Sequence, residues 1–486
     1  MIIALAVLIG YGSTLKSGFM YDDRFFVSEN LSVHSLANAP AFFTSPKATT
    51  ASIPWNNIWR PLRNVSYALD HALWGLKPIG FHLTNLALHL VNCLLMVAIA
   101  GRLLPGGPAP LIAGLIFALH PVQVEAVAWI SGRDDLLLAL FLLSAWLFRM
   151  RYLLSGKKAW LAVALACYVL ALLSKETATV FPLALPVLDV IFSPDKKHPA
   201  GKPRWKEYLI WAAVAGAYFT IRLALLGGLA HRGFWGGSFI ANVLTMLWAL
   251  AQYLRLLVLP LWLRVDYVIP PVVWLGDWRW MAGLAAALTA TALAWRYRAA
   301  RWPLFSWAWF IIFLLPVSNL IPIAAIMAER FLYLPMAGVC LLAGWILAGL
   351  SAKPRRILAT VLCLAMLGLT LRRGLEWQEP GRFWKTETAR SPNSAIAHNN
   401  LGQHHYRQGD MGSAEKCFLR ALGIHPGLSS ARASLGDVYY HTGRYGMAID
   451  QYREYLRLEP QARNRIQAEH RIQRISDRLG QASENR

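Results

Sequence analysis

Twelve apolar runs constrain this chain of 486 residues more than any other feature of its sequence. A membrane-spanning helix needs about 20 predominantly apolar residues, and each run approaches that length. Charged residues make up only 15% of the chain, whereas soluble domains contain about 25%. The sequence therefore excludes a single water-soluble fold and predicts an all-α, multi-pass membrane protein. The runs begin near Ile2, Phe81, Ala109, Asp134, Ala159, Thr177, Trp205, Ile240, Trp278, Trp302, Phe331 and Arg355.

Basic residues between the runs predict how the chain is oriented. Cytoplasmic loops are enriched in Lys and Arg, and the basic clusters fit a cytoplasmic N-terminus, except that three runs separate two such clusters across residues 205–296. One of the three should not cross. We expect 240–260 to be interfacial or re-entrant, because it contains Gln252 and Arg255 and ends at Pro260. About eleven crossings remain, the first of them a retained helix that lacks the basic segment of a signal peptide.

In this topology the acidic residues of the membrane part gather outside. Of the 14 acidic residues in 1–375, 11 lie on the non-cytoplasmic side, so polar chemistry is expected there. The net charge of +22 does not indicate nucleic acid, because no basic stripe interleaved with aromatic residues occurs outside the loops. The outer acidic residues are Asp22, Asp23, Glu29, Asp70, Glu125, Asp134, Asp135, Glu176, Asp266, Asp277 and Glu329.

The last hundred residues contain a repeat of 34 residues. This period, with small residues where paired helices meet and Pro after the second helix, is the tetratricopeptide pattern. We predict a membrane domain over 1–375 with a first outer loop at 17–80, a degenerate half-repeat at 376–394, and an α-solenoid of repeats with a capping helix at 395–486. The recurring pairs are Leu401/Leu435, Gly402/Gly436, Gly409/Gly443, Ala414/Ala448, Phe418/Tyr452 and Pro426/Pro460.

Two adjacent carboxylates follow the first apolar run. Asp22 and Asp23 could include a general base that takes a proton from an incoming hydroxyl, with a pKa adjusted by burial and by the neighbouring charge. The alternative is a solvated loop pair that marks the topology.

A second polar cluster lies at the outer turn between the third and fourth runs. His120, Glu125, Arg133 and Asp134 are expensive to bury at a membrane boundary, so they are expected to line a wet cavity. A satisfied interfacial histidine and a structural salt-bridge network are the alternatives. No spacing of His, Asp or Glu here predicts a metal site.

Arg330 and Tyr333 open an apolar run on the outer side. An Arg at the bilayer surface can bind a lipid phosphate through two hydrogen bonds. The alternative is a snorkelling side chain that pairs locally with Glu329.

Taken in order, these blocks resemble the transmembrane-and-tetratricopeptide O-mannosyltransferase family, part of the GT-C class of glycosyltransferases that use polyprenyl-phosphate donors. The resemblance covers nearly the whole chain, although only about two and a half repeats follow the membrane part, fewer than is common in the animal members. It is carried by Tyr21-Asp22-Asp23, Trp59-Arg60-Pro61-Leu62, Phe81-His82-Leu83-Thr84-Asn85, His120-Pro121, Glu125-Ala126-Val127, Gly132-Arg133-Asp134, the 260–267 segment, Glu329-Arg330-Phe331-Leu332-Tyr333-Leu334-Pro335 and the repeats.

The resemblance implies a GT-C-type helical bundle that moves a sugar, mannose in the family, from a polyprenyl phosphate to a hydroxyl of a protein or glycan, with inversion. Asp22 or Asp23 would be the base and Arg330 would hold the carrier phosphate. The already ionised leaving phosphate does not require a metal. The other expected donor-binding or pocket residues are Arg24, His120, Glu125, Arg133, Asp134 and Tyr333.

The expected partners are a membrane lipid carrier and an acceptor docked by the repeats, without nucleic acid. The expected location is the bacterial inner membrane with periplasmic repeats, or the endoplasmic reticulum with lumenal repeats in a eukaryote. A non-enzymatic scaffold that recruits partners through its repeats is the main alternative. A transporter or a polysaccharide ligase fits less well, because the membrane part lacks an internal repeat and its large outer loop comes first.

Overall fold

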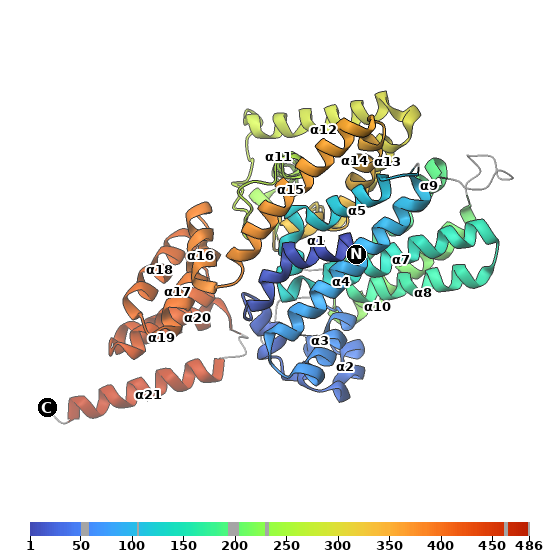
Figure 1. The fold of residues 1–486 in the computed structure, drawn as a ribbon. Coiled ribbons are helices and arrows are strands. Elements are labelled where there is room, and N and C mark those ends of the chain that lie inside the picture. Colours follow the sequence, from blue (N-terminus) through green and yellow to red (C-terminus); the bar gives the residue numbers. More distant parts are fainter. Residues whose placement is uncertain (50–57, 105, 193–203, 229–232, 461–464, 485–486) are drawn as a thin grey trace.

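The computed structural model describes residues 1–49, 58–104, 106–192, 204–228, 233–460 and 465–484. Within these ranges the regular structure is entirely helical and contains no strand, which confirms the all-α prediction. Figure 1 shows a large bundle built by the first three quarters of the chain, with the C-terminal helices beside it.

Each of the twelve apolar runs forms a helix, because a chain that crosses lipid must satisfy its own backbone hydrogen bonds. These helices are α1 (Ile2–Tyr11), α4 (Pro78–Leu103), α5 (Ala109–Leu119), α7 (Arg133–Ser155), α8 (Lys158–Ser174), α9 (Phe181–Phe192), α10 (Trp205–Leu226), α11 (Phe239–Val258), α12 (Trp278–Arg296), α13 (Trp302–Leu314), α14 (Met336–Ala348) and α15 (Ala352–Glu376).

Five helical segments among the described residues are long and apolar enough to cross a membrane. A sixth span is possible if α5 and the segment Pro121–Ala128, bent by 51° at the break, count as one. Four shorter apolar helical segments, such as Lys158–Ser174, would bring the total among the described residues to ten, so the predicted eleven crossings stay a prediction.

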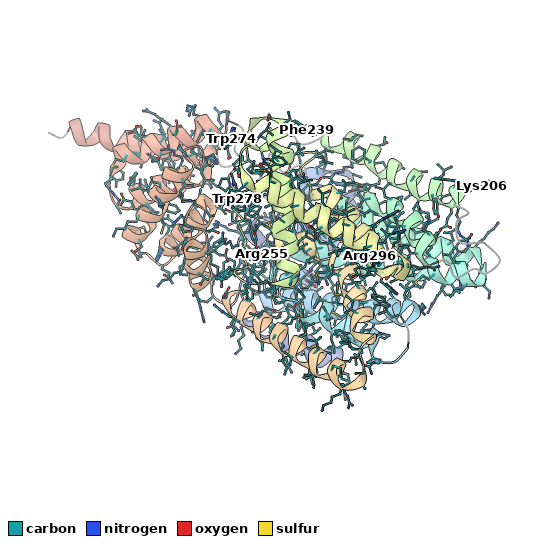
Figure 2. The ribbon with its side chains drawn as sticks, turned by 90° about the horizontal axis from the view of Figure 1, so that it is seen from above. Lys206, Phe239, Arg255, Trp274, Trp278 and Arg296 are labelled. Atoms are coloured by element: carbon teal, nitrogen blue, oxygen red, sulfur yellow. The ribbon has the colours of Figure 1, made fainter. Side chains whose placement is uncertain are left out.

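Helix α11 covers the segment that the sequence predicts to be interfacial or re-entrant. Its 20 residues are long and apolar enough to cross a membrane, and the interfacial placement of 240–260 stays a prediction. Gln252 accepts a hydrogen bond from Arg255 at 3.0 Å, so the two polar side chains partly satisfy each other. Figure 2 shows α11 crossing α12. The two backbones touch at Gly283, where a Cβ atom would lie 2.2 Å from the Leu247 carbonyl oxygen.

The first outer loop folds into a small layer with its own apolar core. It contains the short helix α2 (Ala39–Thr44) and the longer helix α3 (Pro61–Trp74), which pack together. Phe26, Phe42 and Tyr67 are buried in this core. The aromatic residues of the loop therefore help to order it.

The repeat region is a series of helix pairs beside the membrane part (Figure 1). Its close contacts explain the 34-residue period: a Cβ atom at Gly402 would lie 2.7 Å from the Phe418 ring, and one at Gly436 would lie 2.8 Å from the Tyr452 ring. Only Gly allows these helices to approach so closely. The helices are α16 (Pro380–Arg390), α17 (Ala395–Arg407), α18 (Met411–Ile424), α19 (Ser429–His441), α20 (Tyr445–Leu458) and α21 (Arg465–Glu484).

Candidate active site

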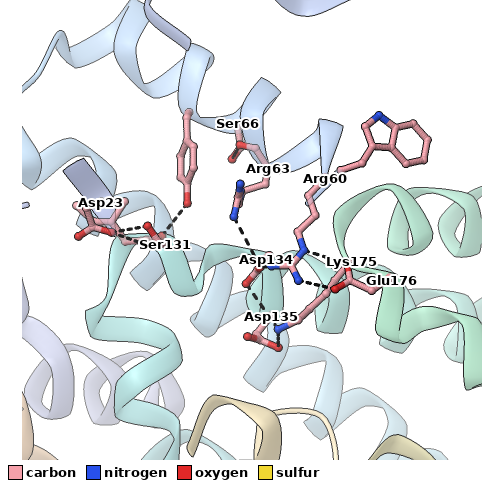
Figure 3. Close-up of polar contacts among 12 residues, drawn as sticks. Asp23, Arg60, Arg63, Ser66, Ser131, Asp134, Asp135, Lys175 and Glu176 are labelled. Carbon is pink, nitrogen blue, oxygen red and sulfur yellow. Dashed lines mark hydrogen bonds and ion pairs between the residues drawn. The ribbon is translucent and has the colours of Figure 1, made fainter. Parts of the chain in front are cut away.

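The two carboxylates in the turn after α1 differ in their burial and in their hydrogen-bond partners. Asp23 is buried, and its carboxylate accepts hydrogen bonds from the Ser131 backbone N at 2.8 Å, the Ser131 hydroxyl at 2.6 Å and the Met20 backbone N at 2.9 Å. Burial raises the pKa of Asp23 to about 7, although these donors oppose the shift. Asp23 thus ties the turn to the segment before α7 (Figure 3).

Asp22 is half-buried, and within the described chain its carboxylate makes no hydrogen bond or ion pair. Burial raises the pKa of Asp22 to about 6, while the positive charges of Arg330 and Arg63 lower it. A carboxylate with this pKa is mostly ionised near neutral pH and remains basic enough to accept a proton. The adjacent Tyr21 has a φ of +52°, an uncommon backbone conformation for a residue with a side chain.

Arg330 lies against a second carboxylate on the same side of the molecule. Glu125 is fully buried, pairs with the Arg330 guanidinium, and accepts a hydrogen bond from the Arg330 backbone N at 2.9 Å. The guanidinium carbon also lies 5.2 Å from the Trp129 ring centroid and 5.1 Å from that of Phe331. Glu125 uses only one guanidinium nitrogen, and the Arg330 side chain is 19% exposed. Donors therefore remain for an anion.

Aromatic rings connect the two halves of this site. The Tyr21 ring lies 5.6 Å from Trp129, which also contacts Arg330, and 5.6 Å from Trp384 of α16. Helix α16 thereby contributes one wall next to Asp22. The structure places Asp22, Glu125 and Arg330 at one centre, not on opposite faces of the bundle.

Asp134 belongs to an ion-pair network beside this centre (Figure 3). Arg60 pairs with Asp134 and forms two hydrogen bonds with Glu176 at 2.6 and 3.0 Å. Lys175 lies 2.6 Å from Asp135 and 3.8 Å from Asp134. Arg60 and Lys175 were not predicted as site residues, although Arg60 stands in the Trp59-Arg60-Pro61-Leu62 block. The feature of the sequence that could have indicated Lys175 and Glu176 is their position as an adjacent Lys-Glu pair at the end of an apolar run.

Arg133 is fully buried and bonded to protein groups. It pairs with Asp70 at 2.6 Å, donates to Asn85 at 2.8 Å, and donates to the Phe81 carbonyl at 2.8 Å. These contacts hold α7 against α3 and α4, which corresponds to the structural alternative weighed from the sequence.

The remaining predicted residues also contact protein groups. His120 is buried and bonds the Leu257 carbonyl at 3.2 Å, which fits a satisfied histidine. The buried Tyr333 hydroxyl lies 2.8 Å from His89 Nδ1. Arg24 is exposed and pairs with Glu29. Among the described residues, no group of three His, Cys, Asp or Glu side chains could hold a metal ion.

The loop between α11 and α12 fastens the repeat region to this centre. The Val265 backbone N donates to Glu387 of α16 at 2.9 Å, and Ser394 donates to the Asp266 carboxylate at 2.6 Å. On the membrane side, Tyr267 donates to Glu329 at 2.8 Å. Burial raises the pKa of Asp266 above its ordinary value, and the bond from Ser394 opposes this shift. Asp266 therefore orders the loop.

Buried ion pairs reinforce the same junction. Arg373, near the end of α15, lies 2.8 Å from Glu387 and 2.8 Å from Glu376. Arg390 bonds Glu376 at 2.6 and 2.7 Å and the Leu263 carbonyl at 3.1 Å. Buried charges are costly unless each is paired. The pairing therefore favours this one arrangement of α15, α16 and the outer loop.

Comparisons with known proteins match both parts of the chain. The tetratricopeptide repeat model matches residues 393–460, which confirms the predicted repeat class. Protein O-mannosyl-transferase Tmtc1 of Drosophila melanogaster is 28% identical over 541 aligned residues, covering 89% of this chain and 62% of the relative. Protein O-mannosyl-transferase TMTC4 of Mus musculus is 25% identical, covering 86% of this chain and 65% of the relative. The chain thus spans less than two thirds of the length of these relatives.

A shorter match and a solved structure complete the comparison. Protein O-mannosyl-transferase Tmtc2 of Drosophila melanogaster is 37% identical over 195 residues, which cover 37% of this chain and 20% of the relative. ArnT from Cupriavidus metallidurans, solved bound to undecaprenyl phosphate, aligns with a TM-score of 0.42 and 15% identity over 93% of this chain and 78% of that chain. The resemblance inferred from the sequence blocks is confirmed by these relatives: over most of its length the chain is similar to proteins named protein O-mannosyl-transferases, and its C-terminal part matches the tetratricopeptide repeat.

Proposed function

We propose that this protein is an integral-membrane glycosyltransferase of GT-C type that moves a sugar from a polyprenyl-phosphate donor to a hydroxyl acceptor on the non-cytoplasmic face. Mannose is the sugar named by its relatives. The observation that carries the proposal is the unpartnered Asp22 carboxylate beside Arg330, whose guanidinium retains free donors.

In the proposed reaction, Asp22 accepts the proton of the acceptor hydroxyl as its oxygen attacks the anomeric carbon. The bond between that carbon and the phosphate oxygen breaks, and the phosphate leaves with the electron pair. Attack opposite the leaving group inverts the anomeric carbon. Arg330 donates to the departing phosphate, and Glu125 holds the guanidinium in place. Positioned charge of this kind lowers the barrier most effectively when it needs no rearrangement during the reaction.

The contacts separate the roles of the two carboxylates. A base must reach the substrate, and Asp22 is half-buried with its oxygens unengaged. Asp23 is buried and already accepts three hydrogen bonds. We therefore assign Asp22 as the base and Asp23 as the residue that positions the turn.

The same centre suggests where the two substrates enter. A lipid-linked donor can reach Arg330 sideways from the bilayer, whereas the acceptor approaches from the water side. Trp384 of α16 lies against Tyr21 beside the proposed base. The repeats that follow α16 are thus placed to present a protein or glycan acceptor. The predicted domain boundaries, and the location in a bacterial inner membrane with periplasmic repeats, are part of this proposal.

The test compares Asp22→Asn and Asp23→Asn in purified full-length protein supplied with radiolabelled polyprenyl-phosphate mannose and a membrane extract as the acceptor source. Asp22→Asn should abolish transfer to the acceptor without changing thermal stability, because its carboxylate has no partner among the described residues to lose. Asp277→Asn is the matched control, since Asp277 is an outer-loop carboxylate that caps α12 away from the site. Undiminished transfer by Asp22→Asn would remove the proposed base.

A second experiment addresses the scaffold alternative. Deletion of 395–486 removes the repeats but leaves Asp22, Glu125 and Arg330 in the chain. The enzyme should still bind the lipid-linked donor after this deletion, and transfer to the acceptor should fall. A protein that binds no donor with or without its repeats would instead support the scaffold.

A further inference from the structure

A cavity outside the proposed active site lies where α15 meets α16, and we call it the α15–α16 cavity. Its volume is about 440 Å³. It is lined by Gly368, Leu371, Arg372, Leu375, Glu376, Arg382, Thr386 and Arg390. The α15 residues recur at intervals of three and four and the α16 residues at intervals of four, so each helix presents a single face to the cavity.

The polar half of the cavity carries excess positive charge. Glu376 is its only acidic lining residue, and both Glu376 oxygens are engaged by Arg390 at 2.6 and 2.7 Å. The side chains of Arg372 and Arg382 are exposed and make no hydrogen bond or ion pair with any described residue. Two guanidinium groups facing one cavity without a carboxylate partner form a suitable binding site for a phosphate group.

The apolar half of the cavity continues along α15. An exposed stripe with a spacing of three and four residues runs down this helix into the cavity, and at Gly368 a Cβ atom would meet nothing within 4 Å. Only 17% of the apolar window of α15 is buried inside the protein, and Figure 2 shows α15 along one edge of the molecule with side chains projecting outward. The stripe consists of Ile357, Val361, Leu364, Gly368, Leu371 and Leu375.

The position along α15 fits the boundary of a bilayer. Lys353 and Arg372 are 19 residues apart in the sequence, which corresponds to about 28 Å at 1.5 Å per residue. This matches the hydrocarbon thickness of about 30 Å. With Lys353 at one membrane surface, the α15–α16 cavity lies at the headgroup level of the other.

We propose that the α15–α16 cavity binds the phosphate headgroup of a membrane lipid whose hydrocarbon chain lies along the stripe on α15. Arg372 and Arg382 hold the phosphate, and the space above Gly368 admits the start of the chain. A free phosphate ion would use only the polar half. The site is separate from Asp22 and Arg330, and it does not depend on the proposed transfer reaction.

Native mass spectrometry of the purified full-length protein tests this site. The protein is titrated with phosphatidylglycerol, with undecaprenyl phosphate and with zwitterionic phosphatidylcholine. We expect one of the two anionic lipids to bind at least tenfold more tightly than phosphatidylcholine, and the double variant Arg372→Gln/Arg382→Gln to lose that preference. Lys385→Gln is the matched control, because Lys385 is an exposed cation of α16 that does not line the cavity.

The choice between the anionic lipids identifies the source of the phosphate. A loss of phosphatidylglycerol binding in the double variant assigns the site to a bilayer glycerophospholipid, and a selective loss of undecaprenyl phosphate binding in that variant assigns it to a polyprenyl carrier. Equal binding of all three lipids, or an unchanged preference in the double variant, would overturn the proposal.

A second variant tests the apolar half and avoids the risk of misfolding. Gly368→Leu places a side chain in open space and replaces a poor helix former with a good one, so the helix should not be destabilised. The leucine should exclude the lipid chain and lower affinity for the preferred lipid at least fivefold, while binding of inorganic phosphate stays unchanged. Wild-type lipid affinity in this variant would show that the chain does not lie on the stripe.

Discussion

The junction between the membrane part and the repeats should open measurably when Glu387 loses its charge. Glu387 is buried, lies 2.8 Å from the Arg373 guanidinium, and accepts a hydrogen bond from the Val265 backbone N at 2.9 Å. Glu387→Gln keeps one acceptor oxygen but removes the charge. Breaking a buried pair costs about 3–5 kcal/mol, and the remaining pair between Arg373 and Glu376 at 2.8 Å reduces the loss. We therefore expect the opening free energy of the junction to fall by about 2–3 kcal/mol, the contribution of one hydrogen bond to a charged group.

Hydrogen exchange reads out this loss directly, because the Val265 amide is itself bonded to Glu387. A change of about 2–3 kcal/mol in the opening free energy corresponds to exchange about 30- to 140-fold faster. The matched control is Glu415→Gln, which breaks a more exposed pair with Arg444. Such pairs contribute about 0–1 kcal/mol, so exchange near the control site should accelerate at most about fivefold.

The reasoning would be refuted if the Val265 amide exchanged at the wild-type rate in Glu387→Gln, or if both variants gave the same acceleration. In either case the ion pairs between α15 and α16 would not be what holds the outer loop. Sugar transfer should also fall in Glu387→Gln, because the displacement of α16 would carry Trp384 away from Tyr21.

Three further predictions concern the turn and the repeats. The rate of transfer, measured as kcat/KM against pH, should fall as the pH drops through about 6. Burial raises the pKa of Asp22 to about 6, and only the ionised form can act as base. A flat profile between pH 5 and 8 would contradict this. Asp23→Ala should lower the free energy of unfolding by about 2–5 kcal/mol, because buried donors lose their acceptor; denaturation that matches Asp22→Ala would argue against it. Gly436→Leu should destabilise the repeats by about 1–3 kcal/mol through overlap with the Tyr452 ring, whereas Gly446→Ala, which faces open space, should not; thermal unfolding followed by circular dichroism separates the two.

Short sequence patterns predicted the helices and the repeats because both depend on interactions between residues close together in the sequence. An apolar run must satisfy its backbone by forming a helix, and a repeat reproduces the same packing at each period. The 34-residue spacing of Gly402 and Gly436 therefore translated directly into contacts with Phe418 and Tyr452. In α11, whose interfacial placement stays a prediction, the polar residues Arg255 and Gln252 bond each other.

The pairing of charged residues was beyond the reach of sequence patterns. Arg60 and Glu176 are 116 residues apart, and Arg133 and Asp70 are 63 apart, yet each pair is in contact. A sequence shows that a charge near the membrane needs a partner, but it does not show which residue supplies it. This is why Arg133 was expected at the donor pocket, whereas the structure engages it fully with protein groups.

The position of α16 also has a consequence for how proteins of this kind diversify. The wall beside Asp22 is built by Trp384, which precedes every complete repeat, and each later helix packs mainly on its sequence neighbours. Recombination that inserts or deletes units beyond α18 therefore leaves the proposed reaction centre intact. Under the proposed function, acceptor choice and bond-forming chemistry can evolve independently within one gene.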